Sequence, residues 1–265
     1  MGVAGDLKNE LGKNCFSILR RNLIMNDYGR YIFFFGLFVV FSFVNLSHST
    51  NPSHYDVTYW EYQKRIGQAG GILNKFKFEE FVQPNDVVVD FGCGGGFLLN
   101  QLNCKSKIGI EINSFAAENA RRQGIKVYES PEYLEDEIAD IIISNHVFEH
   151  LSNPFDTIKL LKSKLKHGGL LIIVVPSEQA VNNSYEYSEH DINQHLYTWT
   201  PMTLGNLVKA AGFKVVKANA IRHCWVGDYI KEATNADLKA YHEKCNEHAL
   251  RTNNYQVRVV AKKTD

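Results

Sequence analysis

The residues best suited to chemistry lie where an apolar run ends in closely spaced glycines. That run leads into Asp90, and Gly92, Gly94 and Gly96 follow at every second position. An apolar strand that passes through glycines into a helix brings bare backbone against a cofactor at the helix N-terminus of an open parallel sheet. The pattern therefore predicts a cofactor-binding loop at residues 90–96.

The spacing of these glycines disfavours two common nucleotide sites. A dinucleotide site of the G-x-G-x-x-G type would need a third glycine where Phe97 stands, and a phenyl ring there would obstruct close packing of helix and strand. A Walker loop would need Lys and Ser or Thr after its last glycine, but Phe97 and Leu98 occupy those positions. An NAD-dependent α/β enzyme is thus an alternative that the position of Phe97 argues against.

The pattern Asp90-x-Gly92-x-Gly94-x-Gly96 resembles the class I S-adenosylmethionine-dependent methyltransferases. The resemblance implies S-adenosylmethionine as the cofactor, with the glycines letting the backbone approach its methionine part. It also implies that Asp90 steadies the loop and the amino group of the cofactor. Cys93, inside the loop, is interpreted as a small residue in a tight turn.

A second acidic residue has the spacing expected for a ribose contact. Glu111 stands nineteen positions after Gly92, close to the roughly 20 residues that place an acid against ribose hydroxyls; the alternative is a surface acid at a strand end. Glu129 lies where the family contacts adenine, although the family usually has Asp there. The predicted cofactor-binding residues are Asp90, Gly92, Cys93, Gly94, Gly96, Glu111, Ile112, Glu129 and Asn145.

Two histidines are candidates for acid–base work on the acceptor. His146 follows the fourth predicted strand, and His195 follows the fifth, where methyltransferases of this type form the acceptor pocket. A general base needs a pKa near neutrality and hydrogen-bond reach of the acceptor proton. Each histidine can equally hold loop backbone, since methyl transfer depends mainly on an in-line approach and can proceed without a base. We nevertheless take His146 and His195 as the catalytic candidates.

The segment from His146 to His150 also spells H-x-x-E-H, an inverse zinc-peptidase motif. On a helix its two histidines would share a face at a spacing that suits zinc, but no further acidic ligand is evident downstream. The segment is similar to the E-x-x-E-H pattern of ubiquinone-pathway O-methyltransferases, which can hold a divalent ion; here His146 replaces the first Glu. We therefore expect no metal site and interpret Glu149 and His150 as a pair that braces the loop.

The remaining pattern alternates strands and helices over roughly residues 55–263, the range that the resemblance covers. Continuous apolar runs indicate strands covered on both faces, and this order matches a Rossmann-like seven-stranded methyltransferase sheet with helices on both faces. The last strand alternates in a way that suits an antiparallel edge partner. The predicted strands after the glycine loop are 107–112, 125–128, 140–144, 170–175, 212–216 and 255–261, with helices at 97–102, 114–122 and 203–211 and an inserted helix at 229–250.

Composition narrows the choice of partner. The chain has 265 residues with 29 basic and 29 acidic side chains, so no global field attracts nucleic acid, and macromolecular substrates are disfavoured. Five widely spaced cysteines indicate neither a disulfide framework nor a metal motif. The preferred acceptor is a small molecule, a lipid-linked group or a sugar. The alternative function is a non-catalytic methyltransferase-like domain that binds cofactor or partner.

The first fifty residues differ from the rest. Residues 31–46 are apolar and uncharged, which is borderline between a membrane span and the core of a signal peptide. Arg20, Arg21 and Arg30 precede this segment and would hold the N-terminus in the cytosol. The alternatives are a cleaved signal, a buried helix or a misplaced start codon. We predict residues 1–50 as an anchor or signal segment and residues 51–265 as the methyltransferase domain, hence a single-pass membrane location and otherwise a cytoplasmic one.

Overall fold

The computed structural model describes residues 55–179, 187–234 and 237–265. The predicted membrane segment at residues 31–46 and the boundary at residue 51 lie outside these ranges. No helix within the described ranges combines the length and the apolarity that a membrane crossing requires. The four cysteines in the same ranges are free.

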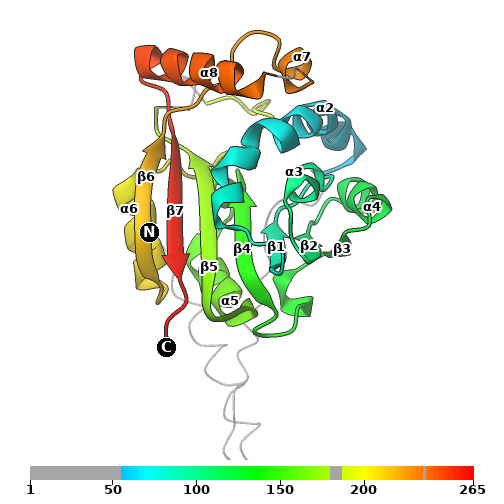
Figure 1. Ribbon diagram of the computed structural model, residues 1–265, viewed down its shortest axis with the longest axis vertical. Coiled ribbons are helices and arrows are strands. Elements are labelled where there is room, and N and C mark those ends of the chain that lie inside the picture. Colours follow the sequence, from blue (N-terminus) through cyan, green and yellow to red (C-terminus); the bar gives the residue numbers. More distant parts are fainter. Residues whose placement is uncertain (1–54, 180–186, 235–236) are drawn as a thin grey trace, which may run out of the picture. The chain divides into compact units, whose positions relative to one another are not determined.

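The described residues contain a seven-stranded sheet in the order β3-β2-β1-β4-β5-β7-β6 (Figure 1). Neighbouring strands are parallel except at β7, which runs antiparallel to both β5 and β6. This arrangement confirms the predicted Rossmann-like sheet. The strands are β1 Val87–Phe91, β2 Ser106–Ile110, β3 Lys126–Tyr128, β4 Ala139–Asn145, β5 Leu165–Pro176, β6 Lys214–Ile221 and β7 Gln256–Lys262.

The last strand is not at the edge of the sheet. Val259 pairs with Ile173 on one side and with Ala218 on the other, so β7 has a neighbour along both sides. Its residues from 257 to 261 are all buried, whereas β6 carries several exposed positions. The alternation in the sequence reflected side chains pointing to two faces, which an internal strand shares with an edge strand. The edge position therefore belongs to β6.

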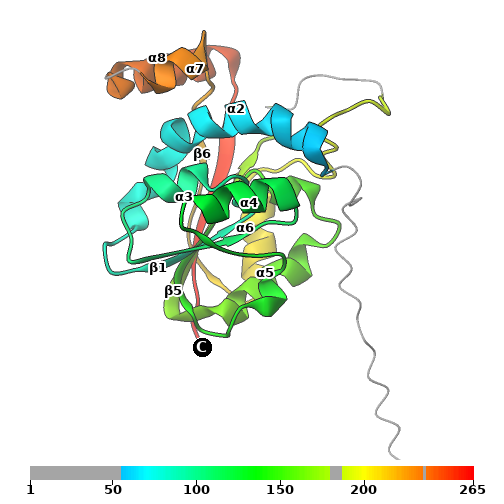
Figure 2. The ribbon, with the colours of Figure 1, turned by 90° about the vertical axis from the view of Figure 1, so that its right-hand side faces the viewer.

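Helices cover both faces of the sheet (Figures 1 and 2). On one face the core joins α5 and α6 to strand residues such as Val89 and Ile142. On the other face it joins α3 and α4 to the alternate residues, among them Val88 and Ile143. Successive side chains thus enter opposite cores, as the continuous apolar runs predicted. The helices are α3 Phe97–Gln101, α4 Ser114–Arg122, α5 Pro154–Lys164 and α6 Pro201–Ala210.

Helix α2 Val57–Asn74 crosses α3 at short range (Figure 2). A Cβ atom at Gly71 would lie 2.6 Å from the carbonyl oxygen of Phe97, so this approach requires a glycine. The ring of Phe97 stacks on Trp60 at a centroid distance of 6.2 Å. Phe97 at the third-glycine position therefore packs against the helix that precedes the sheet, and Trp60 has a packing role.

The insertion between β6 and β7 contains two helices instead of the single predicted one. They are α7 Tyr229–Ala233 and α8 Leu238–Thr252. Tyr241 and Cys245 of α8 are buried in a small cluster with Leu73 of α2. The insertion thus packs on α2 and lies at the end of the sheet where β7 begins (Figure 1). Single turns of 3-10 helix complete the fold, namely η1 Lys75–Lys77, η2 Glu79–Phe81, η3 Pro131–Tyr133 and η4 Phe148–His150.

Candidate active site

The glycine loop lies between β1 and α3 and depends on left-handed backbone. Gly96 is the N-cap of α3 with φ of 80°, and a Cβ atom there would lie 2.5 Å from Ile125 Cδ1. A side chain at Gly92 would collide with Val147, which follows β4. These two glycines are therefore required by packing inside the protein itself, and they bring the loop close to the end of β4.

Cys93 is a buried structural residue of this loop. Its Sγ occupies the space that a side chain at Gly109 of β2 would need. Burial and the nearby carboxylates of Glu111 and Asp90 raise the pKa of the Cys93 thiol well above its ordinary value. A thiol held in its neutral form is a poor nucleophile, so Cys93 fits the interpretation of a small residue in a tight turn.

Glu111 directly follows β2 and ties the loop to the next helix. Its Oε2 accepts a hydrogen bond from the Gly94 N–H at 2.8 Å, and its Oε1 accepts one from the Asn113 N–H at 2.8 Å. Burial raises the pKa of Glu111, although these hydrogen bonds oppose the shift. The structure therefore brings Glu111 to the glycine loop as the sequence predicted, and it adds a contact with Gly94 that spacing alone did not reveal.

Asp90 and Glu111 are two buried acids without a cationic partner. Among the described residues neither carboxylate takes part in an ion pair within 4.0 Å. Asp90 is 2% exposed, and burial followed by the charge of Glu111 raises its pKa to about 8. Beside them, Gly94 has φ of 52° and nothing within 4 Å of the position of a Cβ atom. Open space next to Glu111 fits a positively charged cofactor such as S-adenosylmethionine, because a cation bound there would favour the ionised forms of Glu111 and Asp90.

The other predicted cofactor residues lie along the same edge of the sheet. The Glu111 N–H donates to the carbonyl of Tyr128, the last residue of β3, so Glu129 follows on the neighbouring strand. Glu129 is exposed, and the side chain of Ile112 is also exposed. An exposed apolar side chain next to Glu111 offers a surface for a flat apolar group. Neither residue has a contact that assigns it to adenine, so that role stays a prediction.

Asn145 and His146 stand at the end of β4, and His146 is held in an unusual backbone conformation. Its φ of 58° lies in the left-handed region, which non-glycine residues rarely adopt and which is common at functional sites. Its Nε2 lies 3.0 Å from Gln256 Oε1, and its Nδ1 lies 3.4 Å from Glu149 Oε1. His146 is therefore oriented by Gln256, with Glu149 beside its other ring nitrogen, while its side chain stays partly exposed.

Behind His146 lies a buried lysine that sequence reasoning missed. Lys77 Nζ donates to Gln256 Oε1 at 2.6 Å and to Asn145 Oδ1 at 3.4 Å. Its side chain is completely buried, and burial lowers the pKa of Lys77 to about 7. Because Lys77 and Gln256 are 179 residues apart, no local pattern in the sequence connects them. Together they set the position of Asn145 and His146.

Glu149 is a fully buried carboxylate below His146. Its Oε1 lies 3.4 Å from His146 Nδ1 and 3.8 Å from His150 Nε2. Burial alone would raise the pKa of Glu149, but the contact with His146 and the charges of His146 and His150 outweigh burial and lower it. Burial lowers the pKa of His150, and the charge of Glu149 opposes that shift only in part. In the pair of Glu149 and His150, Glu149 is thus the ionised residue.

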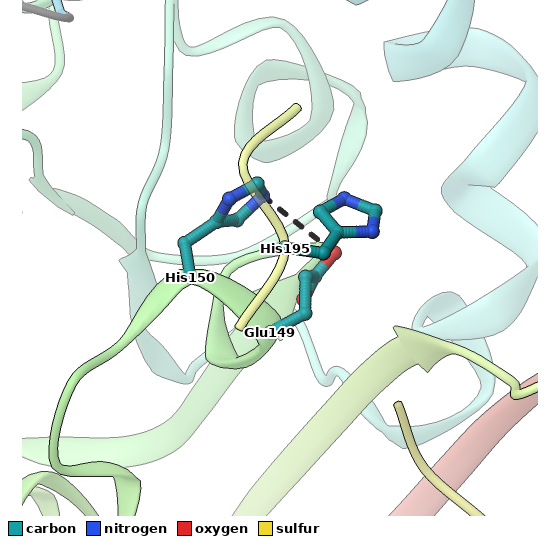
Figure 3. A group of neighbouring side chains, drawn as sticks. All are labelled: Glu149, His150 and His195. Carbon is teal, nitrogen blue, oxygen red and sulfur yellow. Dashed lines mark ion pairs between the residues drawn. The ribbon is translucent and has the colours of Figure 1, made fainter. Parts of the chain in front are cut away.

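The loop before α6 brings His195 to this pair. The N–H groups of Leu196 and Tyr197 both donate to the carbonyl of Glu149, at 2.8 and 3.3 Å. The rings of His150 and His195 consequently meet edge to face at a centroid distance of 4.8 Å. Figure 3 shows Glu149, His150 and His195 pointing toward one another from the η4 turn and from this loop. One ligand atom from each lies within 4.8 Å of the others, so these three side chains could hold a metal ion.

Two tyrosines, Tyr55 just before α2 and Tyr59 in its first turn, lie near both Glu111 and Glu149. Burial, followed by the charges of Glu111 and Glu149, raises the pKa of Tyr55 to about 12. The pKa of Tyr59 is raised by burial as well, with both carboxylates contributing. The negative charges of Glu111 and of the buried Glu149 therefore act on both tyrosines. Glu111 and Glu149 therefore both lie near the start of α2.

This fold, with its glycine loop and the acid after β2, defines a class I S-adenosylmethionine-dependent methyltransferase. A family model described as a methyltransferase domain matches residues 59–218. The chain belongs to this methyltransferase domain family, and S-adenosylmethionine is its cofactor.

Comparison with individual proteins supports the class without defining the acceptor. A ribosomal protein L11 methyltransferase from Cupriavidus taiwanensis is 26% identical over 135 residues, which are 48% of this chain and 41% of that protein. The chain thus spans less than half the length of this curated relative. A methyltransferase from Thermotoga maritima, described as a possible histamine N-methyltransferase, shares the fold with a TM-score of 0.56 at 20% identity, over 77% of this chain and 95% of that one. Phosphoethanolamine N-methyltransferase 2 from Haemonchus contortus, solved with S-adenosyl-L-methionine, has a TM-score of 0.50 at 15% identity, over 73% of this chain and 52% of that one.

Proposed function

We propose that this enzyme transfers a methyl group from S-adenosylmethionine to a small-molecule, lipid-linked or sugar acceptor. The observation that carries the proposal is the adjacency of two sets of residues. Glu111 holds the Gly94 N–H next to open space, and Val147, the residue after His146, packs against Gly92 of the same loop. The acceptor would lie between these sets, over His146 and the loop of His195.

Each group of residues in the site has a separate proposed role in binding or methyl transfer. Asp90 and Glu111 would hold the cationic cofactor, which supplies a methyl group on a positively charged sulfur. Asn145 and His146 would hold the acceptor in line with that methyl group, the arrangement that contributes most to such a transfer. His146 or His195 would take the proton that the acceptor releases when its new bond to the methyl carbon forms.

A protein acceptor is the main competing outcome, because the curated relatives are named for ribosomal protein L11. The neutral balance of 29 basic and 29 acidic residues supports a small acceptor instead. Incubation of the enzyme with methyl-labelled S-adenosylmethionine and three separate cell fractions decides between them. We expect label in the metabolite or lipid fraction. Label confined to the protein fraction would contradict the proposal.

The cellular location is a further proposal that rests on residues 31–46 alone. We propose that this segment anchors the protein to a membrane. The support is its uninterrupted apolar composition after Arg20, Arg21 and Arg30. The test is described with the other predictions in the Discussion.

A further inference from the structure

We propose that Asn113 is a positioning residue that links Glu111 to the start of helix α2. Binding of the cofactor at Glu111 then fixes the tyrosines at that helix start before the acceptor arrives. The inference rests on the proposed role of Glu111 in holding the cofactor, and it does not depend on the class of acceptor. The sequence analysis did not single out Asn113, because its partner lies 57 residues earlier in the chain.

Asn113 makes hydrogen bonds in three directions. Its main-chain N–H donates to Glu111 Oε1 at 2.8 Å. Its side-chain oxygen accepts from the N–H groups of Phe115 and Ala116, at 3.0 and 3.2 Å, and so caps helix α4. Its side-chain nitrogen donates to the carbonyl of Asp56 at 3.1 Å. Asn113 therefore joins the acid after β2, the start of α4 and the residue before α2.

Asp56 is the residue through which this link acts on α2. It is the N-cap of the helix, and its carboxylate accepts the N–H groups of Thr58 and Tyr59 at 2.8 and 2.9 Å. Its carbonyl accepts the N–H of Trp60 at 3.1 Å and also the bond from Asn113, which is 3% exposed. Because buried polar groups keep their hydrogen bonds, the orientation of Asn113 determines where the first turn of α2 lies.

The first turns of α2 lie over the glycine loop. A Cβ atom at Gly95 would lie 2.8 Å from Trp60 Cη2, so the indole ring packs directly on the backbone of the loop. Two views of the fold show α2 above α3 and α4 (Figures 1 and 2). A shift of the helix start would therefore uncover the loop on which the cofactor is expected to bind.

The carboxylate of Glu111 connects the cofactor to this arrangement. One of its oxygens accepts from Gly94 and the other accepts from Asn113. A carboxylate can accept about four hydrogen bonds, so both oxygens keep capacity for hydroxyl groups of the cofactor ribose. A cofactor bound there would restrict the movement of Glu111, and through Asn113 it would restrict Asp56 and the first turn of α2.

The tyrosines at the start of α2 would complete the acceptor side of the site. The rings of Tyr55 and Tyr59 meet edge to face with centroids 5.1 Å apart. Burial, followed by nearby negative charges that include Glu111 and Glu149, raises the pKa of both hydroxyls, that of Tyr55 to about 12. Both hydroxyls therefore stay neutral. An acceptor would meet this pair in its final position only once the cofactor has fixed α2, so the cofactor should bind first.

Hydrogen exchange of the full chain, with and without saturating S-adenosylmethionine, tests the link. At about 100 times Kd we expect the cofactor to slow amide exchange at least about tenfold, both at residues 92–96 and at residues 57–63. In Asn113→Ser the hydroxyl still caps α4 but is too short to reach Asp56, so the cofactor should slow only residues 92–96. Asn113→Asp, whose oxygens cap α4 but cannot donate, should behave in the same way. The matched control is Asn153→Ser, because Asn153 is the N-cap of α5 on the other face of the sheet; its response should equal that of the unaltered protein.

Two results would overturn the link. One is equal slowing of residues 57–63 in Asn113→Ser and in the unaltered chain, and the other is no slowing of these residues in the unaltered chain although residues 92–96 are slowed. Calorimetry with S-adenosylmethionine shows that each variant is folded. The glycine loop separates this inference from the proposed function, because slowing at residues 92–96 alone refutes only the link. No slowing at residues 92–96 would refute the proposed cofactor position and the link with it.

Discussion

The buried Lys77 makes a quantitative prediction about stability and pH. Burial lowers its pKa from 10.5 to about 7 in the folded protein, and the unfolded chain keeps the ordinary value. Between these two values the unfolded state binds more protons than the folded state, so the free energy of unfolding must rise as pH increases. The slope approaches 1.4 kcal/mol per pH unit. From pH 6.5 to pH 8.5 this single group should add about 2 kcal/mol.

The assay compares three proteins by urea denaturation at pH 6.5, 7.5 and 8.5, with free energies extrapolated to water. Lys77→Met should lose the rise of about 2 kcal/mol. Lys75→Met is the matched control, since Lys75 lies in the same turn and is exposed beside Glu79; it should keep the rise. Asp90, whose pKa is raised to about 8, lowers stability over the same range, but it does so equally in all three proteins. The difference in pH dependence between Lys77→Met and the unaltered protein therefore reports the titration of Lys77.

The offset between the curves is less informative than their slopes. Lys77→Met removes the cost of burying a charge, but it also removes one donor to Gln256 Oε1 and one to Asn145 Oδ1, and each effect is about 1–3 kcal/mol or more. Parallel curves for Lys77→Met and the unaltered protein would refute the reasoning. They would mean that Lys77 keeps an ordinary pKa in the folded state.

Three further predictions concern the cofactor and the N-terminal segment. Glu111→Gln should weaken S-adenosylmethionine binding by about 1.5–3 kcal/mol, the typical cost of losing charge-assisted hydrogen bonds, whereas the exposed Glu118→Gln should not; calorimetry measures both. Gly94→Ala and Gly124→Ala both place a side chain at positive φ in open space, so each should lower the free energy of unfolding by about 1 kcal/mol. Only Gly94→Ala should abolish cofactor binding. Equal cofactor affinities of the two variants would contradict the placement of the cofactor next to Gly94. Deletion of residues 1–50 should leave a domain that binds the cofactor, while the full chain should stay with membranes in alkaline carbonate; release at full mass would exclude an anchor at residues 31–46.

The sequence predicted the residues around the glycine loop better than those around His146, for a physical reason. The glycine loop and Glu111 lie at the ends of adjacent strands, so their spacing along the chain is fixed by one β-α-β unit. The sequence pattern of this unit is therefore sufficient to predict the positions of the glycine loop and of Glu111. The contact between Glu111 and Gly94 was not predicted, but the two residues were.

The surroundings of His146, where we propose that the acceptor binds, are assembled from distant segments. His195 reaches His150 only because the carbonyl of Glu149 accepts two N–H groups from its loop. Likewise Lys77 reaches His146 only through Gln256. Contacts of this kind depend on loop conformation and on the order of strands, which periodicity does not encode. The edge position wrongly expected for the last strand has the same origin.

The internal position of β7 also affects the order in which the chain can fold. Strand β6 pairs only with β7 in the described sheet, so during synthesis it has no partner until residues 256–262 have emerged. Strands β1 to β5 have no such dependence on β7 for their parallel pairing, and they can assemble first. For the interval in which the ribosome adds the roughly eighty residues from the end of β5 to the start of β7, at roughly 5–20 residues per second, the flank of β5 stays open. A chaperone that recognises unpaired strand edges would therefore act on this protein between the synthesis of β5 and that of β7.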